Sequence, residues 1–255
     1  MKEKIYTTKK NGLAMMFLIL LFMLGGLALT IFGAIRMDSD STNPLNIAML
    51  VVGILILVLG WIPFCGLKVL KPQEALVLTL FGKYMGTLKE EGFYYVNPFC
   101  TAVNPAALTK LAQSGDAAGN VKGASDVTQA SMDSFSKKIS LKAMTLNNGR
   151  QKINDCLGNP VEIGIAVIWK VTDTAKAVFN VDNYKEYLSL QCDSALRNIV
   201  RIYPYDVATD VDTTGDGQAD EGSLRGSAEV VAERIKNEIQ AKVEDAGLEI
   251  VDARI

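Results

Sequence analysis

Two long apolar runs without a charged side chain constrain this chain more than any other feature of its sequence. They cover residues 12–35 and 43–67. Each run exceeds the roughly 20 residues that an α-helix needs to cross a hydrocarbon core about 30 Å thick. We therefore expect two membrane-spanning helices, at about 12–35 and 44–67. The alternatives are a buried helix of a soluble domain or, for the first run, a signal peptide, whose apolar core is only about 7–15 residues long.

The link between the two runs, Arg36–Thr42, is so short that the helices must return as antiparallel neighbours. The link carries one arginine and two aspartates, whereas four lysines precede the first run: Lys2, Lys4, Lys9 and Lys10. By the positive-inside rule, both chain ends lie on the cytoplasmic side. The sequence thus predicts a cytoplasmic flank (1–11), a transmembrane hairpin (12–67) and a cytoplasmic domain (68–255).

The remaining chain is mildly acidic, because residues 68–255 hold 21 basic and 25 acidic side chains. This balance argues against nucleic acid as a partner. Four cysteines are scattered without paired spacing, which predicts free thiols in a reducing compartment: Cys65, Cys100, Cys156 and Cys192.

Short strands are expected directly behind the hairpin. "EALVLTLFG" and "GFYYVNPF" are rich in Val, Leu, Phe and Tyr, and the glycines of "GKYMGT" predict turns between them. Residues 101–138 are rich in Ala, Ser, Gly, Asp and Gln. They predict a flexible low-complexity insertion with one short helix near "PAALTKLA".

Order is expected to resume with "KKISLKAMTL" and a strand over 161–171, where apolar side chains recur at every second residue. Asp173 caps an expected short helix over "TAKAVFNV", and longer helices are expected over about 183–202 and 227–246, with Gly247 as a stop. "LEIVDARI" has the pattern of a closing strand. The sequence predicts an α+β domain in two layers, with a β-meander and helices packed on a sheet.

The chain from Val69 onward, apart from the insertion, resembles the SPFH/Band 7 family, the group of stomatin, prohibitin, flotillin and bacterial membrane scaffolds. The resemblance rests on three segments in this order: "VLKPQEALVLTLFGKYMGTLKEEGFYYVNPF", "DCLGNPVEIGIAVIWKVTDTAKAVFNVDNYKEYLSLQCDSALRNIVRIYPYD" and "LRGSAEVVAERIKNEIQAKVEDAGLEIVDARI". This family places its β-rich domain immediately behind a membrane anchor, against the lipid face.

The resemblance implies a non-enzymatic oligomeric scaffold that organises membrane microdomains and associated membrane proteins. A regulatory subunit that binds and restrains a membrane protease is the alternative. Many family members have one anchor rather than a hairpin. The family usually continues past "VDARI" into a long charged helix, so either the sequence is an excerpt or ring formation is weakened.

Catalytic chemistry has little support, since a chain without histidine lacks the usual triads, His-ligated metals and proton shuttle. We expect no enzyme activity and no cofactor. In "DTTGDGQADEGS", Asp212, Asp216 and Asp220 take positions one, five and nine of a calcium loop, but Ser223 replaces the glutamate at position twelve. A solvated acidic loop is the simpler interpretation.

The expected partners are membrane lipids, further copies of the chain and, in the alternative, a membrane protease. The expected location is a bacterial plasma membrane, crossed twice. Gly26, Thr30 and Ala34 recur at four-residue spacing and would let the two helices approach closely. The amphipathic helix from Ser227 is the element expected to contact other copies, the alternative being that its apolar stripe serves only the core.

Overall fold

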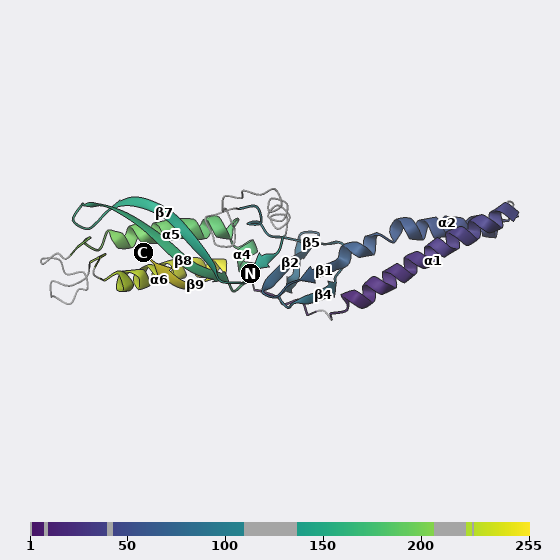
Figure 1. The fold of residues 1–255 in the computed structure, drawn as a ribbon, viewed down its shortest axis with the longest axis horizontal. Coiled ribbons are helices and arrows are strands. Elements are labelled where there is room, and N and C mark those ends of the chain that lie inside the picture. Colours follow the sequence, from purple (N-terminus) through teal and green to yellow (C-terminus); the bar gives the residue numbers. More distant parts are fainter. Residues whose placement is uncertain (1, 8–9, 40–42, 110–136, 207–222, 226) are drawn as a thin grey trace, which may run out of the picture. The chain divides into compact units, whose positions relative to one another are not determined.

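The computed structural model describes residues 2–7, 10–39, 43–109, 137–206, 223–225 and 227–255. The chain forms two compact units (Figure 1). The anchor unit, as we name it, comprises Ile5–Ala102, and the second unit comprises Met1–Lys4 with Val103–Ile255.

Two antiparallel helices make up most of the anchor unit (Figure 1). They are α1 (Gly12–Ser39) and α2 (Pro44–Leu59), and the 3₁₀ helix η1 (Ile62–Gly66) follows α2. By length and composition, Gly12–Met37 and Pro44–Gly66 are each able to cross a membrane. The first helix thus includes Arg36, and the second turns into a 3₁₀ helix before Leu67, where we expected its end.

A β-layer follows the helices within the same unit. Its strands are β1 (Leu67–Leu70), β2 (Glu74–Leu80), β3 (Lys83–Leu88), β4 (Gly92–Tyr95) and β5 (Cys100–Ala102). β1 pairs antiparallel with β4, and β2 lies between β3 and β5, antiparallel to both. Apolar side chains of these strands, including Leu70, Leu76, Leu78, Leu88 and Tyr94, form the buried core of the layer.

Two expectations for this layer were wrong. Gly82 and Gly86 of "GKYMGT" were expected to supply turns; Gly82 does so together with Phe81, but Gly86 lies inside strand β3 (Lys83–Leu88). The insertion was expected to begin at residue 101, but Thr101 and Ala102 pair with β2 in strand β5. Strand pairing with β2 supplies the order that the local composition does not indicate.

The second unit has a sheet and helices in two layers (Figure 1). The sheet order is β7 (Met144–Asn154), β8 (Pro160–Val171), β9 (Leu248–Arg254), all antiparallel. The short strand β6 (Ile139–Ser140) precedes them. Along β8 the buried side chains alternate from Val161 to Val171, as the period of two predicts. Strand β7 was not predicted, because its residues "MTLNNGRQKIN" are mostly polar.

The three predicted helices are confirmed. They are α4 (Thr174–Phe179), α5 (Tyr184–Val200) and α6 (Ala228–Val243), the last continued by the 3₁₀ turn η2 (Glu244–Ala246). Asp173 caps α4 by accepting a hydrogen bond from the Lys176 amide. Gly247 ends the helical run with φ +67°, and a Cβ there would meet the Asp173 backbone.

Part of the expected insertion, residues 110–136, lies outside the described residues. The described part, Val103–Thr109, contains a turn, and the remainder of the segment in which a short helix was expected lies outside the described residues. Asn104 holds this turn by donating from Nδ2 to the Lys138 carbonyl at 2.9 Å and accepting from the Ala106 amide.

Candidate functional site

The contact between α1 and α2 is built from small residues. A Cβ on Gly53 of α2 would lie 2.8 Å from the Thr30 backbone nitrogen, and one on Gly33 would lie 3.0 Å from the Leu50 nitrogen. A Cβ on Gly26 would clash with Ile56. The expected approach at Gly26 and Thr30 is therefore confirmed. Ala34 is exposed, and Gly33 takes its place because it lies on the face toward α2.

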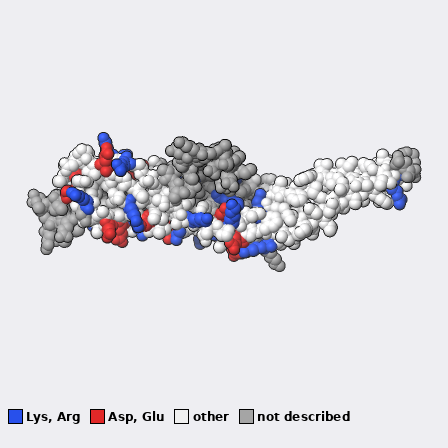
Figure 2. Space-filling model, viewed as in Figure 1, with Lys and Arg blue, Asp and Glu red and all other residues white. Residues whose placement is uncertain are grey.

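The outer surface of the two helices is apolar. Large side chains such as Leu21, Phe22, Ile35, Leu55 and Val58 are each about half exposed or more. The visible face of the hairpin carries no charge between its two ends (Figure 2). An exterior of this kind is stable in hydrocarbon and unstable in water, so the hairpin is the candidate membrane anchor.

Polar groups at the tip of the hairpin interact with other residues of the hairpin through a hydrogen bond and a cation–π contact. Asn46 is buried and donates from Nδ2 to the Arg36 carbonyl at 3.3 Å. The Arg36 guanidinium lies 5.0 Å from the centre of the Phe32 ring, a cation–π contact. An arginine and an aromatic ring at a helix end suit the boundary between lipid and water.

Both lower ends of the hairpin contact strand β4 or the residue directly after it. A Cβ on Gly12, the first residue of α1, would lie 2.8 Å from the carbonyl carbon and oxygen of Phe93. At the end of η1, a Cβ on Gly66 would strike the carbonyl oxygen of Val96, the residue directly after β4, and the Val96 amide donates to the Gly66 carbonyl at 2.9 Å. Gly12 of α1 and Gly66 of η1 thus allow close backbone contact with β4 and with the residue directly after it, which joins the hairpin to the β-layer.

The flank before α1 joins the same layer. Ile5 forms a parallel bridge with Thr87 of β3, and the Tyr6 amide donates to the Thr87 carbonyl at 2.9 Å. Lys10 pairs with Glu90 at 3.4 Å. Residues that precede the hairpin therefore contact residues that follow it, which requires both to lie on the same side of the hairpin.

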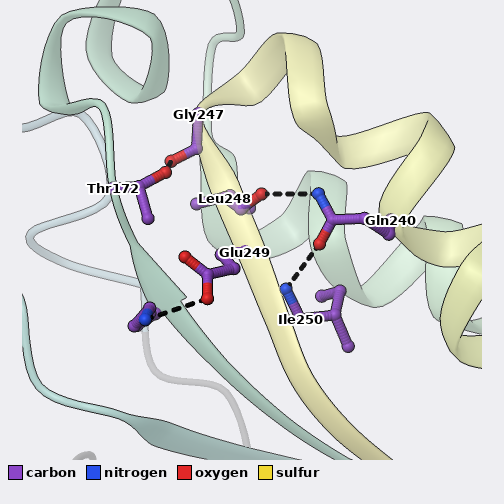
Figure 3. A network of polar contacts seen from close by, with 7 residues as sticks. Thr172, Gln240, Gly247, Leu248, Glu249 and Ile250 are labelled. Carbon is purple, nitrogen blue, oxygen red and sulfur yellow. Dashed lines mark hydrogen bonds and ion pairs between the residues drawn. The ribbon is translucent and has the colours of Figure 1, made fainter.

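In the second unit, a glutamine of α6 closes the outer edge of strand β9 (Figure 3). Gln240 donates from Nε2 to the Leu248 carbonyl at 3.2 Å and accepts from the Ile250 amide at 2.7 Å. Further along, the Asp252 carboxylate accepts from the Ala253 amide at 2.9 Å. These side chains occupy edge groups that another strand would need, so they oppose strand addition at this edge.

A buried carboxylate organises the opposite end of the sheet. Asp155 accepts hydrogen bonds from the amides of Leu157, Asn159 and Tyr205 and from the Asn159 side chain, at 2.7–3.1 Å. Burial raises the pKa of Asp155, but these hydrogen bonds outweigh it and hold the pKa below its ordinary value. The carboxylate ties the β7–β8 turn to the chain after α5, a structural role.

The apolar stripe of α6 lies in the core of its own unit. Val231, Ile235, Ile239 and Val243 are fully buried there. The stripe therefore serves the core of its own unit, so a contact of this helix with other copies would have to use its exposed face. It packs against β9 and α5, and these particular partners could not be predicted from the sequence. The exposed surface of α6 is mixed: it includes Glu229, Glu233 and Arg234, and Val230 is 53% exposed.

The remaining sequence expectations concern metals and thiols. Asp212, Asp216 and Asp220 of the expected calcium loop lie outside the described residues. Within the residues that the structure does describe, no cluster of acidic or thiol side chains is suited to a metal. All four cysteines are free thiols, as expected, with Cys100 and Cys192 buried. Burial, with a smaller contribution from Asp193, raises the pKa of Cys192 to about 12.

Sequence patterns alone did not reveal the residues that shape this site. Gly12 and Gly66 stand at the ends of the apolar runs, and glycine at such a junction is a usable signal of close backbone approach. Gln240 offers no such signal, because its partners on β9 are set by the tertiary packing.

Fold and site together define a membrane-associated α+β protein whose two apolar helices precede its β-layer. The sequence profile described as "SPFH domain / Band 7 family" matches residues 68–255. The chain therefore belongs to the SPFH domain / Band 7 family, as its motifs predicted. A comparison with curated proteins gave no match. Family membership is consistent with a role as a membrane scaffold.

Proposed function

We propose that this protein is a non-enzymatic oligomeric scaffold that organises membrane microdomains and the membrane proteins within them. The observation that carries the proposal is the joint between anchor and β-layer, where Gly12 of α1 meets β4 and Gly66 of η1 meets Val96 directly after it. A β-layer held directly on its anchor has a defined depth and orientation at the bilayer. Contacts between copies then fix the lateral positions of their anchors.

Both chain ends and the domain lie in the cytoplasm of a bacterial cell, with the hairpin crossing the plasma membrane twice. The support is the pairing of Ile5 and Tyr6 with Thr87, which puts flank and domain on one side. Four lysines in the flank, against one arginine and two aspartates near the tip, favour the cytoplasmic side for that end.

The scaffold acts by binding, without making or breaking a bond. A chain with no histidine lacks the commonest acid–base group. Its partners are lipids and further copies of itself. The neighbours that it positions are membrane proteins, with proteases as one class.

The particle size of the full-length protein in native lipid nanodiscs tests this proposal. A large homo-oligomer is the expected result, and proximity labelling from that particle should mark other membrane proteins. A small complex of one or two copies with a protease would instead favour the regulatory-subunit alternative. A particle holding a single copy and no other protein would refute both.

A further inference from the structure

Three chain connections of the anchor unit lie at the same end of its strands, the end at which η1 leads from the hairpin into β1. The first is the junction of η1 and β1 at Gly66, and the second is the turn between β2 and β3. The third connection comprises Val96 to Phe99. It lies at the same end because the Val96 amide bonds the Gly66 carbonyl and Cys100 pairs with Leu80 at the end of β2. The paired strands are antiparallel, so all three connections lie on the side of the β-layer from which the hairpin extends.

Two phenylalanines on these connections expose their apolar rings, which is unfavourable in water. Phe81 in the β2–β3 turn is 87% exposed, and Phe99 is 57% exposed. Their rings stack with centroids 6.3 Å apart and planes inclined by 25°. A stacked pair of exposed rings beside a membrane anchor is an apolar patch that lipid would cover.

The backbone at Phe81 strengthens this point. Phe81 has φ +47° and Gly82 has φ +83°, and the pair closes a two-residue hairpin between Leu80 and Lys83. Turns with two positive φ values favour asparagine, aspartate and glycine, and a bulky residue there is a strained outlier. Strain of this kind is often found where a side chain is held for a function.

Other exposed residues at the turn and beyond the end of α2 have the chemistry of a membrane interface. Lys83 is exposed directly after the turn. Trp61 is exposed at the end of α2 and lies 5.8 Å from Phe64, ring centre to ring centre. Aromatic rings with a nearby lysine are typical of the level where lipid headgroups meet the hydrocarbon.

We infer that Phe81 and Phe99 form an aromatic foot that inserts into the headgroup boundary of the bilayer, a second contact beside the hairpin. Its occupant is lipid, because the foot continues the surface on which the anchor leaves the β-layer. The foot sets the tilt of the β-layer against the membrane. This inference rests on the proposed membrane anchoring.

Fluorescence quenching by lipid tests the foot. In a Trp61→Phe background, Phe81→Trp places a reporter in the turn, and buried Trp169 gives a constant signal. The full-length variant is reconstituted in vesicles of phosphatidylcholine and phosphatidylglycerol whose acyl chains carry bromine near the headgroup. We expect Phe81→Trp to lose a large share of its emission, comparable with the loss from Trp61 in the unaltered chain.

The matched control is Lys71→Trp in the same background, because Lys71 is exposed at the opposite end of β2. We expect that reporter to keep its emission. Equal emission from the Phe81→Trp and Lys71→Trp reporters would overturn the foot. If Trp61 itself escaped quenching, the membrane anchor would fail as well, so the two failures are distinguishable.

A second variant separates lipid contact from turn stability. Phe81→Asn suits the positive φ and should raise the thermal midpoint of the protein in detergent. In the same brominated vesicles, Phe99→Trp should be quenched less when combined with Phe81→Asn than when Phe81 is present. Equal quenching in the two backgrounds would count against a paired foot.

Discussion

Single side chains that bond backbone groups hold distant segments of this protein together. Gln240 spans two residues of β9, and Asp155 joins the β7–β8 turn to Tyr205. Each replaces water at buried backbone groups that would otherwise lose a hydrogen bond. The loss of such a residue costs more than the loss of an exposed ion pair, because the backbone groups stay buried and unpaired.

Asp155→Asn should lower the free energy of unfolding by about 1–3 kcal/mol at neutral pH, because hydrogen bonds to a charged group are lost. The folded pKa of Asp155 is depressed, so its contribution is present above the unfolded pKa, near 3.9, and is lost as the pH falls through the folded pKa. The difference between the two proteins should therefore shrink below about pH 4.

Thermal or denaturant unfolding in detergent at pH 7 and at lower pH measures this difference. Asp182→Asn serves as the control, since Asp182 is exposed, and its effect should stay within about 0.5 kcal/mol. A pH-independent loss for Asp155→Asn would show that its charge is not the stabilising feature.

At the scale of elements, the association of α1 with α2 in lipid depends on close packing rather than on the hydrophobic effect. In lipid both the separated and the paired helices have apolar surroundings, so close packing of small residues must supply the attraction. Gly53 of α2 meets Thr30 of α1 almost backbone to backbone, whereas a Cβ added to Gly25, on the neighbouring face, would meet no atom within 4 Å.

Gly53→Ala should destabilise the full-length protein by about 1–3 kcal/mol, because the added methyl group forces the helices apart. Gly25→Ala is the matched control. It adds the same methyl group toward open space and should stabilise its helix slightly through its higher helix propensity. Thermal midpoints in detergent compare the two, and equal shifts would contradict the close approach of α1 and α2.

At the scale of the whole molecule, the second unit exposes arginines beside β7 and glutamates on α6, where Arg234 is also exposed. On one side, Arg197 of α5 bonds Gln151 of β7, and Arg150 is exposed next to it. On the other side, beside β9, α6 exposes Glu229 and Glu233. A head-to-tail contact between copies would bring these sides together and repeat around a ring.

Charge-reversal variants test whether these two surfaces of the second unit contact each other between copies. Glu229→Lys with Glu233→Lys should reduce the size of the assembly, and so should Arg150→Glu with Arg197→Glu, because like charges facing across an interface cost several kcal/mol. A chain that carries all four changes should assemble again. Native mass photometry in nanodiscs measures the outcome, and unchanged assembly in both double variants would exclude this contact.

The proposed orientation predicts which thiols react in intact cells. In a Cys65→Ser variant, Cys156 is the remaining exposed thiol, because Cys100 and Cys192 are buried. An impermeant maleimide should leave Cys156 unlabelled until the cells are permeabilised. Met37→Cys near the hairpin tip should be labelled from outside. The reverse pattern would place the domain outside the cytoplasm.

Much of the α+β fold was predictable because its signals are local. Asp173, the alternation from Val161 to Val171 and Gly247 each mark an element by a feature of a few residues. Strands β5 and β7 escaped prediction, because polar or small residues form strands only when a partner strand supplies the hydrogen bonds. For the site, sequence indicated the anchor and Gly26 with Thr30, but not the contacts at β4.

The order of residues was enough to establish two apolar helices, an α+β domain of the SPFH domain / Band 7 family and free thiols. Run length, periodicity and helix caps act over short stretches, so they can be read without a structure. Tertiary packing was needed to show that α6 buries its apolar stripe in its own core and that the hairpin stands on β4. Those outcomes depend on which surfaces meet, and residues far apart in the chain determine that together.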